Sequence, residues 1–568
     1  MAALPRNGEI ADAFDLLADL SELLGEEGFR VLAYRRAATR IRDTAESVAE
    51  LAQTGRARDL SGIGRTIEEK IVELATTGAM QALEKRRAQV PPELVSFLRL
   101  PGLGPKTAAR IWHELGVTTL AGLEEAARAQ RIRELKGLGA KSEENILEAL
   151  AAGLGAEPEQ RGLLGKGLPV LREVVAALAD HPSVVAVSEA GSARRRRETF
   201  RDLDVIATSS DPPALTSFFT TRPWVSEVIA QGETKATVIT KQGHRLDLRV
   251  VPPECYGDLL QHFTGSKNHN IALREDAQRR GLSISEYGVT EVETGVQHTF
   301  ATEEELYAFL GYSYIPPELR EASGELEAAR AGALPRLVEQ SDLVGELHCH
   351  STWSADGKSS IEEMALAARA RGYRFLCLTD HSHYLRDGRM EAQWEEIADV
   401  NVRLQPFKVL RGVEANIKVD GTVDVPDELL AELDWVVASL HQAFDRSPTE
   451  RVLAAIANPH VDCIGHLTGR KLSRRRPAPI DVAKVVVAAV EHRTALEINS
   501  QPDRLDLCDV HARLAGEAGV MVPVTTDAHS VAALAYAELG IAQARRAWLT
   551  KDNVLNTRSW SQIAKLRS

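Results

Sequence analysis

The sequence has few cysteines and no long apolar run, and both absences restrict what the chain can be. Five cysteines in 568 residues lie far apart and form no C-x-x-C pair, which argues against a disulfide framework and a thiolate zinc site. No stretch approaches the roughly 20 apolar residues that a membrane helix needs. The first residues also lack the basic flank and apolar core of a signal peptide. We therefore expect a cytoplasmic protein with no membrane partner.

Length and charge are those of a multidomain globular protein. The chain has 568 residues, 44% hydrophobic and 26% charged, which is enough for about three to four domains of roughly 150 residues. The net charge of -13 does not exclude a nucleic-acid partner, because arginines cluster at 194–197 and 474–476. Ten of the 16 histidines follow residue 343, so we expect a different chemistry in the carboxyl-terminal part.

One short pattern occurs three times in a region that should be helical, residues 1 to about 155. The segments 60–71, 100–111 and 135–146 each place two glycines and an apolar residue before a helix. Such glycines allow a sharp turn that brings backbone N–H groups at a helix N-terminus close to a phosphate. Three copies favour helix-hairpin-helix units that bind the DNA backbone, over simple turns between packed helices. The glycines are Gly62, Gly64, Gly102, Gly104, Gly137 and Gly139.

Short β-branched runs between about 156 and 255 predict a sheet with helices, and this sheet carries three carboxylates. Asp202 and Asp204 lie two apart on one strand, so both point to the same face, and Asp247 lies on the polar face of a second strand. Three carboxylates on adjacent strands suit two divalent metals in phosphoryl transfer, although a solvated strand face is the alternative. Groups that can hold a triphosphate precede the first strand: Gly191, Ser192 and Arg195.

These residues resemble the palm of the family X DNA polymerases, within the nucleotidyltransferase superfamily. HFTGSKNHNIALRE at 262–275 resembles the family's thumb, and VLAYRRAATRI with LSGIGRTIEEKI resembles its amino-terminal domain, which grips a downstream 5'-phosphate. The resemblance implies that Asp202 and Asp204 bind two Mg²⁺ or Mn²⁺ ions, while Asp247 binds the catalytic one and helps deprotonate the primer 3'-hydroxyl. It also implies a nucleotide-binding set of Arg161, Gly191, Ser192, Arg195, Phe263, Gly265, Asn270 and Arg274, and a DNA contact at Tyr34. We interpret Arg30, Arg35 and Arg36 as contacts to DNA phosphates, with ordinary surface charge as the alternative.

Three positions depart from this family pattern. Phe200 and Arg201 stand where a small hydroxyl or aliphatic residue and then often a glycine are expected. His262 stands where the family commonly has an aromatic residue. These differences leave nucleotide affinity and sugar discrimination open.

A lysine in the amino-terminal region raises a further activity. Lys70 falls where polymerase beta carries the Schiff-base lysine of its sugar-phosphate lyase, a reaction that an amine with a lowered pKa can perform. Thr66, however, replaces a neighbouring lysine of that site. A lyase and an ordinary helix lysine near DNA therefore both remain open.

After residue 343, seven apolar runs alternate with helix-like segments, which predicts a barrel of parallel strands. Active sites of such barrels gather at the carboxyl ends of the strands, where this chain places histidines and carboxylates. Imidazole and carboxylate without thiolate suit zinc, manganese or iron. A lone histidine at a strand end is more often structural, but a whole set favours a metal centre. The set is His348, His350, Asp356, His381, Glu414, His441, His466, Asp527 and His529.

This set resembles the motifs of the PHP (polymerase and histidinol phosphatase) domains, which implies a distorted seven-stranded barrel with three divalent metals. The expected groups are His348, His350, Glu414 and Asp527 for one metal, Asp356, His381 and His529 for a second, and Glu414, His441 and His466 for a third. Water activated there would attack a phosphodiester or phosphomonoester.

The two resemblances cover nearly the whole chain and follow the order of bacterial family X polymerases. The expected parts are an all-α domain that binds a DNA 5'-phosphate (1–85), helix-hairpin-helix fingers (86–155), an α+β palm (156–255), a thumb (256–320), a polar linker (321–342) and a (β/α)7 PHP barrel (343–568). We expect a monomer that uses dNTPs to fill gapped or nicked DNA in base excision repair. The barrel would be a 3'-5' exonuclease, with AP endonuclease or 3'-end phosphoesterase activity as further options.

Two other functions fit parts of the pattern. The first is a DNA-end-binding PHP nuclease whose palm is inactive through Phe200, Arg201 and His262. The second is a nucleotidyltransferase with an attached phosphatase that acts on small molecules rather than DNA. The presence of all three palm carboxylates argues against an inactive palm. The three helix-hairpin-helix repeats argue against an enzyme that acts only on small molecules.

Overall fold

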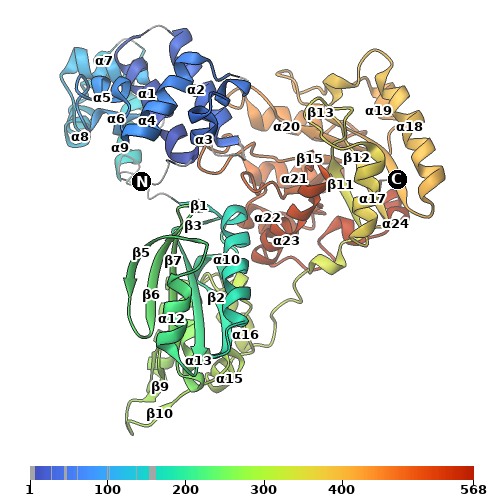
Figure 1. Cartoon of the computed structure of the whole chain (residues 1–568). Coiled ribbons are helices and arrows are strands. Elements are labelled where there is room, and N and C mark those ends of the chain that lie inside the picture. Colours follow the sequence, from blue (N-terminus) through green and yellow to red (C-terminus); the bar gives the residue numbers. More distant parts are fainter. Residues whose placement is uncertain are drawn as a thin grey trace. The chain divides into compact units, whose positions relative to one another are not determined.

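The computed structural model describes residue 5 and residues 7–26, 28–43, 48–60, 62–98, 100, 103–135, 137–151 and 161–567. The chain divides into two compact units, Met1–Gln160 and Arg161–Ser568 (Figure 1). Among the described residues, no helix combines the length and apolarity that crossing a membrane requires. Gly102, one of the glycines expected to bind DNA, lies outside the described residues.

The described part of the first unit is helical, as the apolar spacing predicts. Apolar side chains at helical intervals, including Ile10, Phe14 and Leu17, are fully buried and form one core. The helices are α1 (Asn7–Leu23), α2 (Gly28–Asp43), α3 (Val48–Gln53), α4 (Arg65–Thr77), α5 (Gln81–Arg87), α6 (Leu94–Phe97), α7 (Pro105–Leu115), α8 (Leu120–Arg128) and α9 (Ala140–Ala151).

The second unit begins with a sheet whose two faces differ in chemistry. The strands β2 (Val184–Ala190), β4 (Asp202–Ser209), β7 (Arg245–Val251), β6 (Lys235–Thr240) and β5 (Val225–Gln231) pair in that order. Only the β4–β7 pair is parallel within this sheet. Leu203, Leu246 and Leu248 are fully buried on the face that α10 (Leu164–Ala179) and α12 (Pro212–Thr220) cover. The carboxylates alternate with these leucines, so they emerge on the opposite face.

Phe200, one of the departures from the family pattern, has a packing role. It lies in β3 (Thr199–Phe200), which pairs with β1 (Gly162–Leu163). Its ring is 1% exposed. A Cβ atom at Gly162 or Gly167 would lie 2.4 or 2.3 Å from that ring, so the two glycines leave the space that the ring fills.

The next segments form a small domain that includes much of the expected linker. Its elements are α13 (Tyr256–Thr264), α14 (Lys267–Arg279), β8 (Leu282–Ser285), β9 (Gly288–Glu291), β10 (Gln297–His298), α15 (Glu303–Phe309) and α16 (Glu325–Arg330). The segment 321–342 differs from the polar linker that its composition suggested. Glu325 is fully buried, 2.7 Å from Nδ1 of the buried His269, and Ala329 and Leu337 join the core of this domain. A buried carboxylate is stable there because the imidazole is its partner.

The rest of the chain forms the expected ring of parallel strands. The sheet runs β11 (Gly345–Cys349), β12 (Phe375–Leu378), β13 (Lys408–Asn416), β14 (Trp435–Ser439), β15 (Cys463–Gly465) and β16 (Ala495–Leu496). One residue separates β16 from β17 (Ile498–Asn499), which pairs with β18 (Val524–Thr525). The backbone N–H of Asp527 donates to His348 O at 2.8 Å and brings the last strand back to β11. With β16 and β17 counted as one strand, residues 343–567 give the seven positions that the sequence predicts.

Helices follow these strands and surround the ring (Figure 1). They are α17 (Ile361–Ala370), α18 (Arg389–Leu404), α19 (Asp427–Leu430), α20 (Pro448–Ile456), α21 (Val482–His492), α22 (Asp509–Glu517), α23 (Ala537–Arg546) and α24 (Trp560–Arg567). Within the second unit, this barrel packs on the palm sheet domain: Leu505 and Leu539 are buried in the same core as the palm leucines. Arg470 of the barrel donates a hydrogen bond to Glu198 beside β3.

Candidate functional sites

The three palm carboxylates lie on neighbouring parallel strands. The register of β4 and β7 places Asp204 opposite Asp247, and Asp202 lies two residues earlier on the same face. Burial, followed by the charges of Asp202 and Asp247, raises the pKa of Asp204 to about 7. Positive charge beside these oxygens would relieve this cost, so the donor set fits divalent cations.

Two arginines on β7 belong to this site, and the sequence analysis missed them. Arg245 Nε donates to Asp247 Oδ2 at 3.0 Å, while the Thr237 hydroxyl donates to Asp247 Oδ1. The guanidinium of Arg249 lies 4.2 Å from the ring centroid of Phe263. Both arginines are two residues from Asp247, so strand alternation is the signal that could have placed them on its face.

A glycine allows the main chain to approach the carboxylates closely. Gly191 starts the short helix α11 (Gly191–Arg194) with φ +63°, directly after β2. A Cβ atom at this position would lie 2.2 Å from Asp204 Oδ2, which no side chain can tolerate. Ser192 follows at once, so the structure brings the predicted Gly-Ser turn to the carboxylates.

Arg195, expected to bind the triphosphate, is held by groups from two other segments. Its Nη1 donates to the Thr264 carbonyl, and its Nε donates to Glu321 at 3.1 Å. A Cβ atom at Gly265 would lie 3.3 Å from Arg195 Nη1, so these two predicted residues are neighbours. Arg546 of the barrel helix α23 donates to the Arg195 carbonyl at 2.8 Å and to Glu321 at 3.0 Å. The barrel therefore touches the expected nucleotide-binding turn.

The remaining predicted nucleotide-binding residues fall into separate places. Asn270 Nδ2 donates to the His262 carbonyl at 2.8 Å, and Arg274 Nη2 lies 3.1 Å from His262 Nδ1. His262 thus holds both residues on the α13–α14 pair. Arg161 donates instead to the Thr199 hydroxyl at 2.9 Å, on the edge strand β3.

The glycine turns of the first unit face open space. Gly64 and Gly104 precede α4 and α7 as N-caps, and Gly62 and Gly137 adopt φ +88° and +85°. Cβ atoms added at these four positions, or at Gly139 before α9, would meet no atom of the described residues within 4 Å. The exposed helix N-termini therefore leave room for a phosphate. Lys70 lies half-buried in α4.

The predicted DNA contacts on α2 differ in accessibility. Tyr34 is only 5% exposed, and its ring centroid lies 6.1 Å from that of Phe14, so it packs in the core instead of contacting DNA. Arg35 donates to Asp19 at 2.9 Å and is partly neutralised. The Arg30 side chain is 49% exposed. The resemblance implied a DNA contact at Tyr34, but the structure places this side chain on the buried face of α2.

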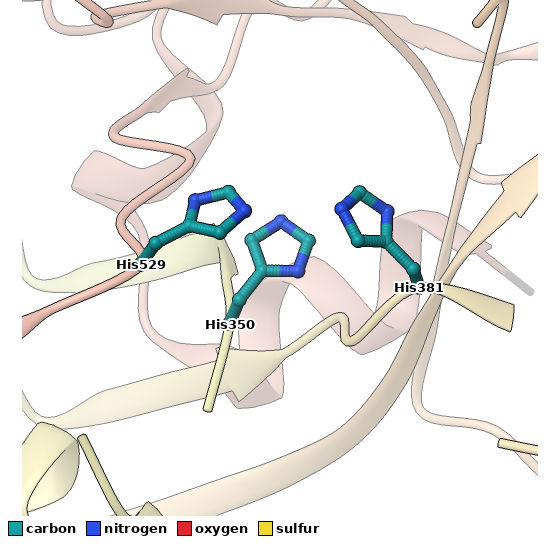
Figure 2. A group of neighbouring side chains, drawn as sticks. All are labelled: His350, His381 and His529. Carbon is teal, nitrogen blue, oxygen red and sulfur yellow. The ribbon is translucent and has the colours of Figure 1, made fainter. Parts of the chain in front are cut away.

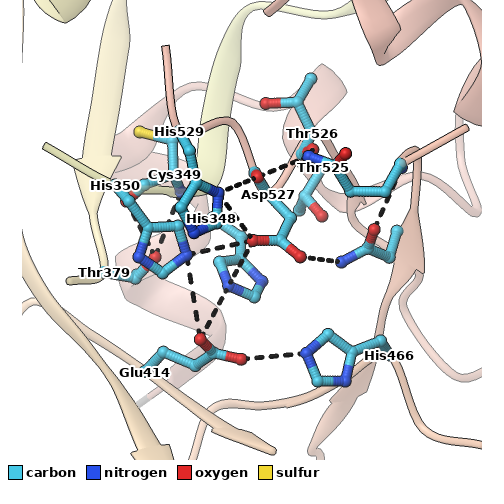
Figure 3. A network of polar contacts seen from close by, with 12 residues as sticks. His348, Cys349, His350, Thr379, Glu414, His466, Thr525, Thr526, Asp527 and His529 are labelled. Carbon is cyan, nitrogen blue, oxygen red and sulfur yellow. Dashed lines mark hydrogen bonds and ion pairs between the residues drawn. The ribbon is translucent and has the colours of Figure 1, made fainter. Parts of the chain in front are cut away.

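The barrel brings all nine predicted ligands together at the carboxyl ends of its strands. Figure 3 shows His348, His350, Glu414, His466, Asp527 and His529 of this set. Their oxygens and ring nitrogens lie close together although the residues span 182 positions of sequence. By element, His348 lies in β11 and Glu414 in β13, and the others follow strands: His350 and Asp356 after β11, His381 after β12, His441 after β14, His466 after β15, and Asp527 and His529 after β18.

The first group of contacts surrounds one oxygen of Glu414 and one of Asp527. His348 Nε2 lies 3.7 Å from Glu414 Oε2 and 3.8 Å from Asp527 Oδ1. His350 Nε2 lies 3.8 and 3.1 Å from the same two atoms. These four residues are the first group that the resemblance to PHP domains implies.

The other two groups have carboxylate oxygens of their own. Asp356 Oδ2 lies 3.4 Å from His381 Nε2 and 3.2 Å from His529 Nε2; Figure 2 shows these two rings on either side of the His350 ring. Glu414 Oε1 lies close to the third group, 3.2 Å from His441 Nε2 and 3.1 Å from His466 Nε2. His381 Nδ1 also reaches Glu414 Oε2 at 2.7 Å, a contact that the predicted grouping lacks.

The donor atoms fit metal ions because several are buried without a hydrogen-bond partner. His348 Nε2 and both oxygens of Glu414 lie within 4 Å of other ligand atoms but make no hydrogen bond of good geometry with a described residue. Each residue is at most 1% exposed. Burial of a carboxylate that forms no hydrogen bond carries a large free-energy cost, which coordination of cations removes.

A second layer, which the sequence analysis missed, holds the ligands in place. Glu497 is fully buried, and its Oε1 lies 2.5 Å from His348 Nδ1. Its Oε2 accepts from the His466 backbone N–H at 2.6 Å. Asn416 Oδ1 lies 2.6 Å from His441 Nδ1. These contacts fix the orientation of the rings, and the available signal was an acidic residue inside the apolar run TALEINS.

Fold and sites define a class: a nucleotidyltransferase joined to a metal-dependent PHP phosphoesterase. Comparison with protein families gives a helix-hairpin-helix domain at residues 5–80, a SAM-like helix-hairpin-helix tandem at 95–152, a DNA polymerase beta thumb at 259–321 and a PHP domain at 346–501.

Full-length and partial relatives agree with this division. The protein named "DNA polymerase/3'-5' exonuclease PolX" of Bacillus subtilis is 40% identical over 566 residues, which are 98% of each chain. The chain therefore belongs to the bacterial family X DNA polymerases that carry a PHP domain. A "Probable phosphatase" of Thermoanaerobacter sp. is 33% identical over 228 residues, 38% of this chain and 91% of that protein. One of Aliivibrio fischeri is 30% identical over 229 residues, 38% and 90% respectively.

Proposed function

We propose that this chain is a DNA polymerase that fills short gaps during repair and shortens DNA 3'-ends with its barrel. The observation that carries the proposal is that one chain combines two separate sites suited to phosphate chemistry, both in the second unit, with exposed helix-hairpin-helix turns in the first unit. The palm site has a complete carboxylate set with Asp204 opposite Asp247. The barrel site has a buried Glu414 shared by two ligand groups. The full-length relative named as both polymerase and exonuclease supports the same pairing.

In the palm, we assign each group a separate task. Ser192 and Arg195 hold the β- and γ-phosphates of the dNTP, since the turn that carries them faces Asp204. Asp202 and Asp204 hold two Mg²⁺ or Mn²⁺ ions, and Asp247 shares one of them and helps remove the proton of the primer 3'-hydroxyl. Arg245 must give up part of its contact with Asp247 before the Asp247 carboxylate can bind a metal ion and accept this proton.

In the barrel, the predicted ligands hold three divalent ions, of zinc, manganese or iron. Divalent ions supply, in both sites, the positive charge that stabilises the phosphate oxygens and favours loss of a proton from water or hydroxyl. Glu414 fixes the spacing of two ligand groups because its two oxygens face different histidines. The hydrolysed bond is the 3'-terminal phosphodiester, and abasic or 3'-phosphorylated ends are further candidate substrates.

The first unit would bind gapped or nicked double-stranded DNA through its open glycine turns. The proposed functional parts are the 5'-phosphate-binding domain (1–85), the fingers (86–155), the palm (156–255), the thumb (256–320) and the barrel from residue 343. The segment 321–342 packs with the thumb. Lys70 is our candidate for a lyase. A monomer remains the expected state, and a cytoplasmic location remains a prediction.

Primer extension tests the palm assignment. On DNA with a one-nucleotide gap and Mg²⁺ or Mn²⁺, the wild type should add one nucleotide, and Asp202→Ala should add none. Asp180→Ala, which removes an exposed aspartate at the end of α10, is the matched control and should behave as wild type. A wild type that never extends a primer with either metal would leave the chain a nuclease with an inactive palm.

Shortening of a 5'-labelled strand tests the barrel assignment. His350→Ala should abolish removal of 3'-nucleotides and leave primer extension intact, because His350 lies only in the barrel site. His492→Ala, which removes an exposed histidine at the end of α21, should change neither activity. If the wild type instead hydrolyses only small phosphomonoesters, the barrel is a phosphatase and the nuclease proposal fails.

A further inference from the structure

An open hollow of about 450 Å³ lies in the barrel, beside the ligands. This volume is within the range of roughly 300 to 1,000 Å³ that small-molecule sites occupy. Two short segments form the hollow, one after β11 and one that includes the 3₁₀ turn η6 (Ser382–Tyr384). Its lining residues are Thr352, Trp353, Ala355, His383, Tyr384, Arg386, Asp387 and Arg389.

The hollow continues directly from the metal-ligand set. Ala355 precedes the ligand Asp356, and the ring centroids of His383 and Tyr384 lie 5.4 and 6.2 Å from that of the ligand His381. His381 and Asp356 would hold a metal ion, and a phosphoester bound to that ion would place one of its substituents in the hollow. The substituent that fits is decided by the chemistry of the walls.

The walls carry aromatic rings in fixed positions. The ring centroids of His383 and Tyr384 are 4.1 Å apart, and the Arg389 guanidinium lies 5.1 Å from the ring centroid of Trp353. Trp353 Nε1 donates to Glu396 at 2.8 Å, and Arg389 Nε donates to the Tyr384 carbonyl at 2.7 Å. Aromatic faces and guanidinium planes stack nucleobases, whatever the base.

The charges at the rim are mainly positive. Arg386 has a side chain that is 65% exposed, and its ion pair with Asp424 is long, at 3.9 Å. Arg389 is exposed beside it, and Asp387 is the one carboxylate among the lining residues. These side chains fit a ligand with one phosphate and an uncharged aromatic base. A sugar phosphate would need more hydrogen-bonding side chains around its hydroxyl groups.

We propose that this hollow binds the 3'-terminal nucleoside of a single DNA strand, with its base against Tyr384 and the next phosphate near Arg386. The proposal rests on the proposed nuclease function and gives that function a substrate class, 3'-ends that carry a base. Stacking adds affinity without choosing among bases, so the barrel should accept all four bases at the end.

A comparison of two substrates separates stacking from catalysis. Tyr384→Ala should raise KM about tenfold for a strand with an ordinary 3'-nucleotide, and should leave KM unchanged for a strand whose last nucleotide is abasic. Tyr384→Phe keeps the ring and should behave as wild type. The metal content of Tyr384→Ala should equal that of wild type, which excludes displacement of His381.

The arginine has its own matched pair of variants. Arg386→Ala should raise KM for both kinds of strand, because the phosphate is present in both. Arg371→Ala removes an exposed arginine at the end of α17 and should have no effect. Equal effects of Tyr384→Ala on ordinary and abasic ends would overturn the subsite.

Photocrosslinking gives a readout that does not depend on activity. A strand ending in 5-iodo-deoxyuridine is irradiated with the full chain in the presence of a chelator, and the attached peptide is identified by mass spectrometry. We expect attachment at His383, Tyr384 or Trp353, and attachment of the last nucleotide to another part of the barrel would contradict the proposal. If wild type with metals shortens no DNA, the nuclease function fails; if it shortens DNA but the terminal nucleotide attaches elsewhere, only the subsite fails.

Discussion

The palm site and the barrel site differ in how far their side chains are already positioned before a substrate binds. In the barrel, His348 and Glu414 are at most 1% exposed, and a further carboxylate, Glu497, already holds a ligand ring. In the palm, Asp247 is engaged by Arg245, whose side chain is 49% exposed. Asp204 carries a raised pKa beside its carboxylate neighbours. The barrel is therefore organised before its substrate arrives, and the palm is completed by nucleotide, metal and primer.

This difference fits the two reactions. Hydrolysis needs only water and one DNA end, so a rigid set of ligands can be kept ready. Nucleotide addition must admit a new triphosphate at each step and release pyrophosphate, so part of the charge balance comes with the substrate. Arg546 of the barrel donates a hydrogen bond to the Arg195 carbonyl, so the rigid barrel contacts the adaptable nucleotide-binding turn of the palm.

The largest effect should come from crowding the palm carboxylates. Gly191→Ala would place Cβ 2.2 Å from Asp204 Oδ2, and a carboxylate displaced by about 1 Å can cost on the order of 10²-fold in rate. We expect single-turnover extension to fall by about that factor while 3'-shortening is unchanged. Gly232→Ala is the control, because its Cβ would meet Lys235 O at an ordinary 3.6 Å. Wild-type extension by Gly191→Ala would contradict the close approach.

The second layer of the barrel should matter next. Glu497→Gln keeps the shape but loses the charge that faces His348 Nδ1, and such changes typically cost about 10- to 100-fold in metal affinity. Chelator competition measures that affinity, and primer extension should not change. Glu491→Gln, at an exposed position of α21, is the matched control. Unchanged metal affinity would mean that Glu497 only fills space.

A smaller effect should cross from the barrel to the palm. Arg546→Met removes the donor to the Arg195 carbonyl and Glu321, so the turn that carries Arg195 loses support. We expect KM for the incoming dNTP to rise about fivefold, or about 1 kcal/mol, with metal content unchanged. Arg545→Met, which removes the neighbouring pair with Glu318, is the control and should leave this KM as in wild type. Equal effects of both variants would indicate general destabilisation.

The smallest effect concerns the pH dependence of stability in the metal-free protein. The folded pKa of Asp204, about 7, is above its ordinary value of 3.8. The folded state therefore holds this proton more tightly, and stability falls as pH rises from about 4 to 7. Asp204→Asn removes the cost, and we expect it to gain about 1 kcal/mol over wild type at pH 8 and less at pH 5. Denaturant unfolding with a chelator measures this; an equal gain at both pH values would contradict the repulsion.

Local patterns in the sequence were sufficient for much of the fold and for the ligand positions. Period-two alternation placed Asp202 and Asp204 on one face, and the order of strands and helices predicted the ring with its histidines at the strand ends. The same alternation could have placed Arg245 and Arg249. These features depend on neighbours in sequence, which a single chain displays directly.

Features that depend on distant partners could not be predicted. The ring of Phe200 fits because Gly162 and Gly167 leave space for it. The buried Glu325 is stable because His269 and the backbone N–H groups of Ala322 and Ser323 contact its carboxylate. Leu505 is a barrel residue in a palm core, a contact that no local pattern encodes. Tyr34 shows the converse case, because a helix position that seemed available to DNA faces the core once the helices pack.

A single reaction tests most directly whether the palm lengthens a DNA strand and the barrel, independently, shortens it. A 5'-labelled primer on one-nucleotide-gapped DNA is incubated with dNTPs and divalent metals, and its length is followed for wild type, Asp247→Ala and Glu414→Ala. We expect Asp247→Ala to give only shorter products and Glu414→Ala only longer ones, with wild type giving both. Loss of both activities in either variant, or of neither, would contradict the account.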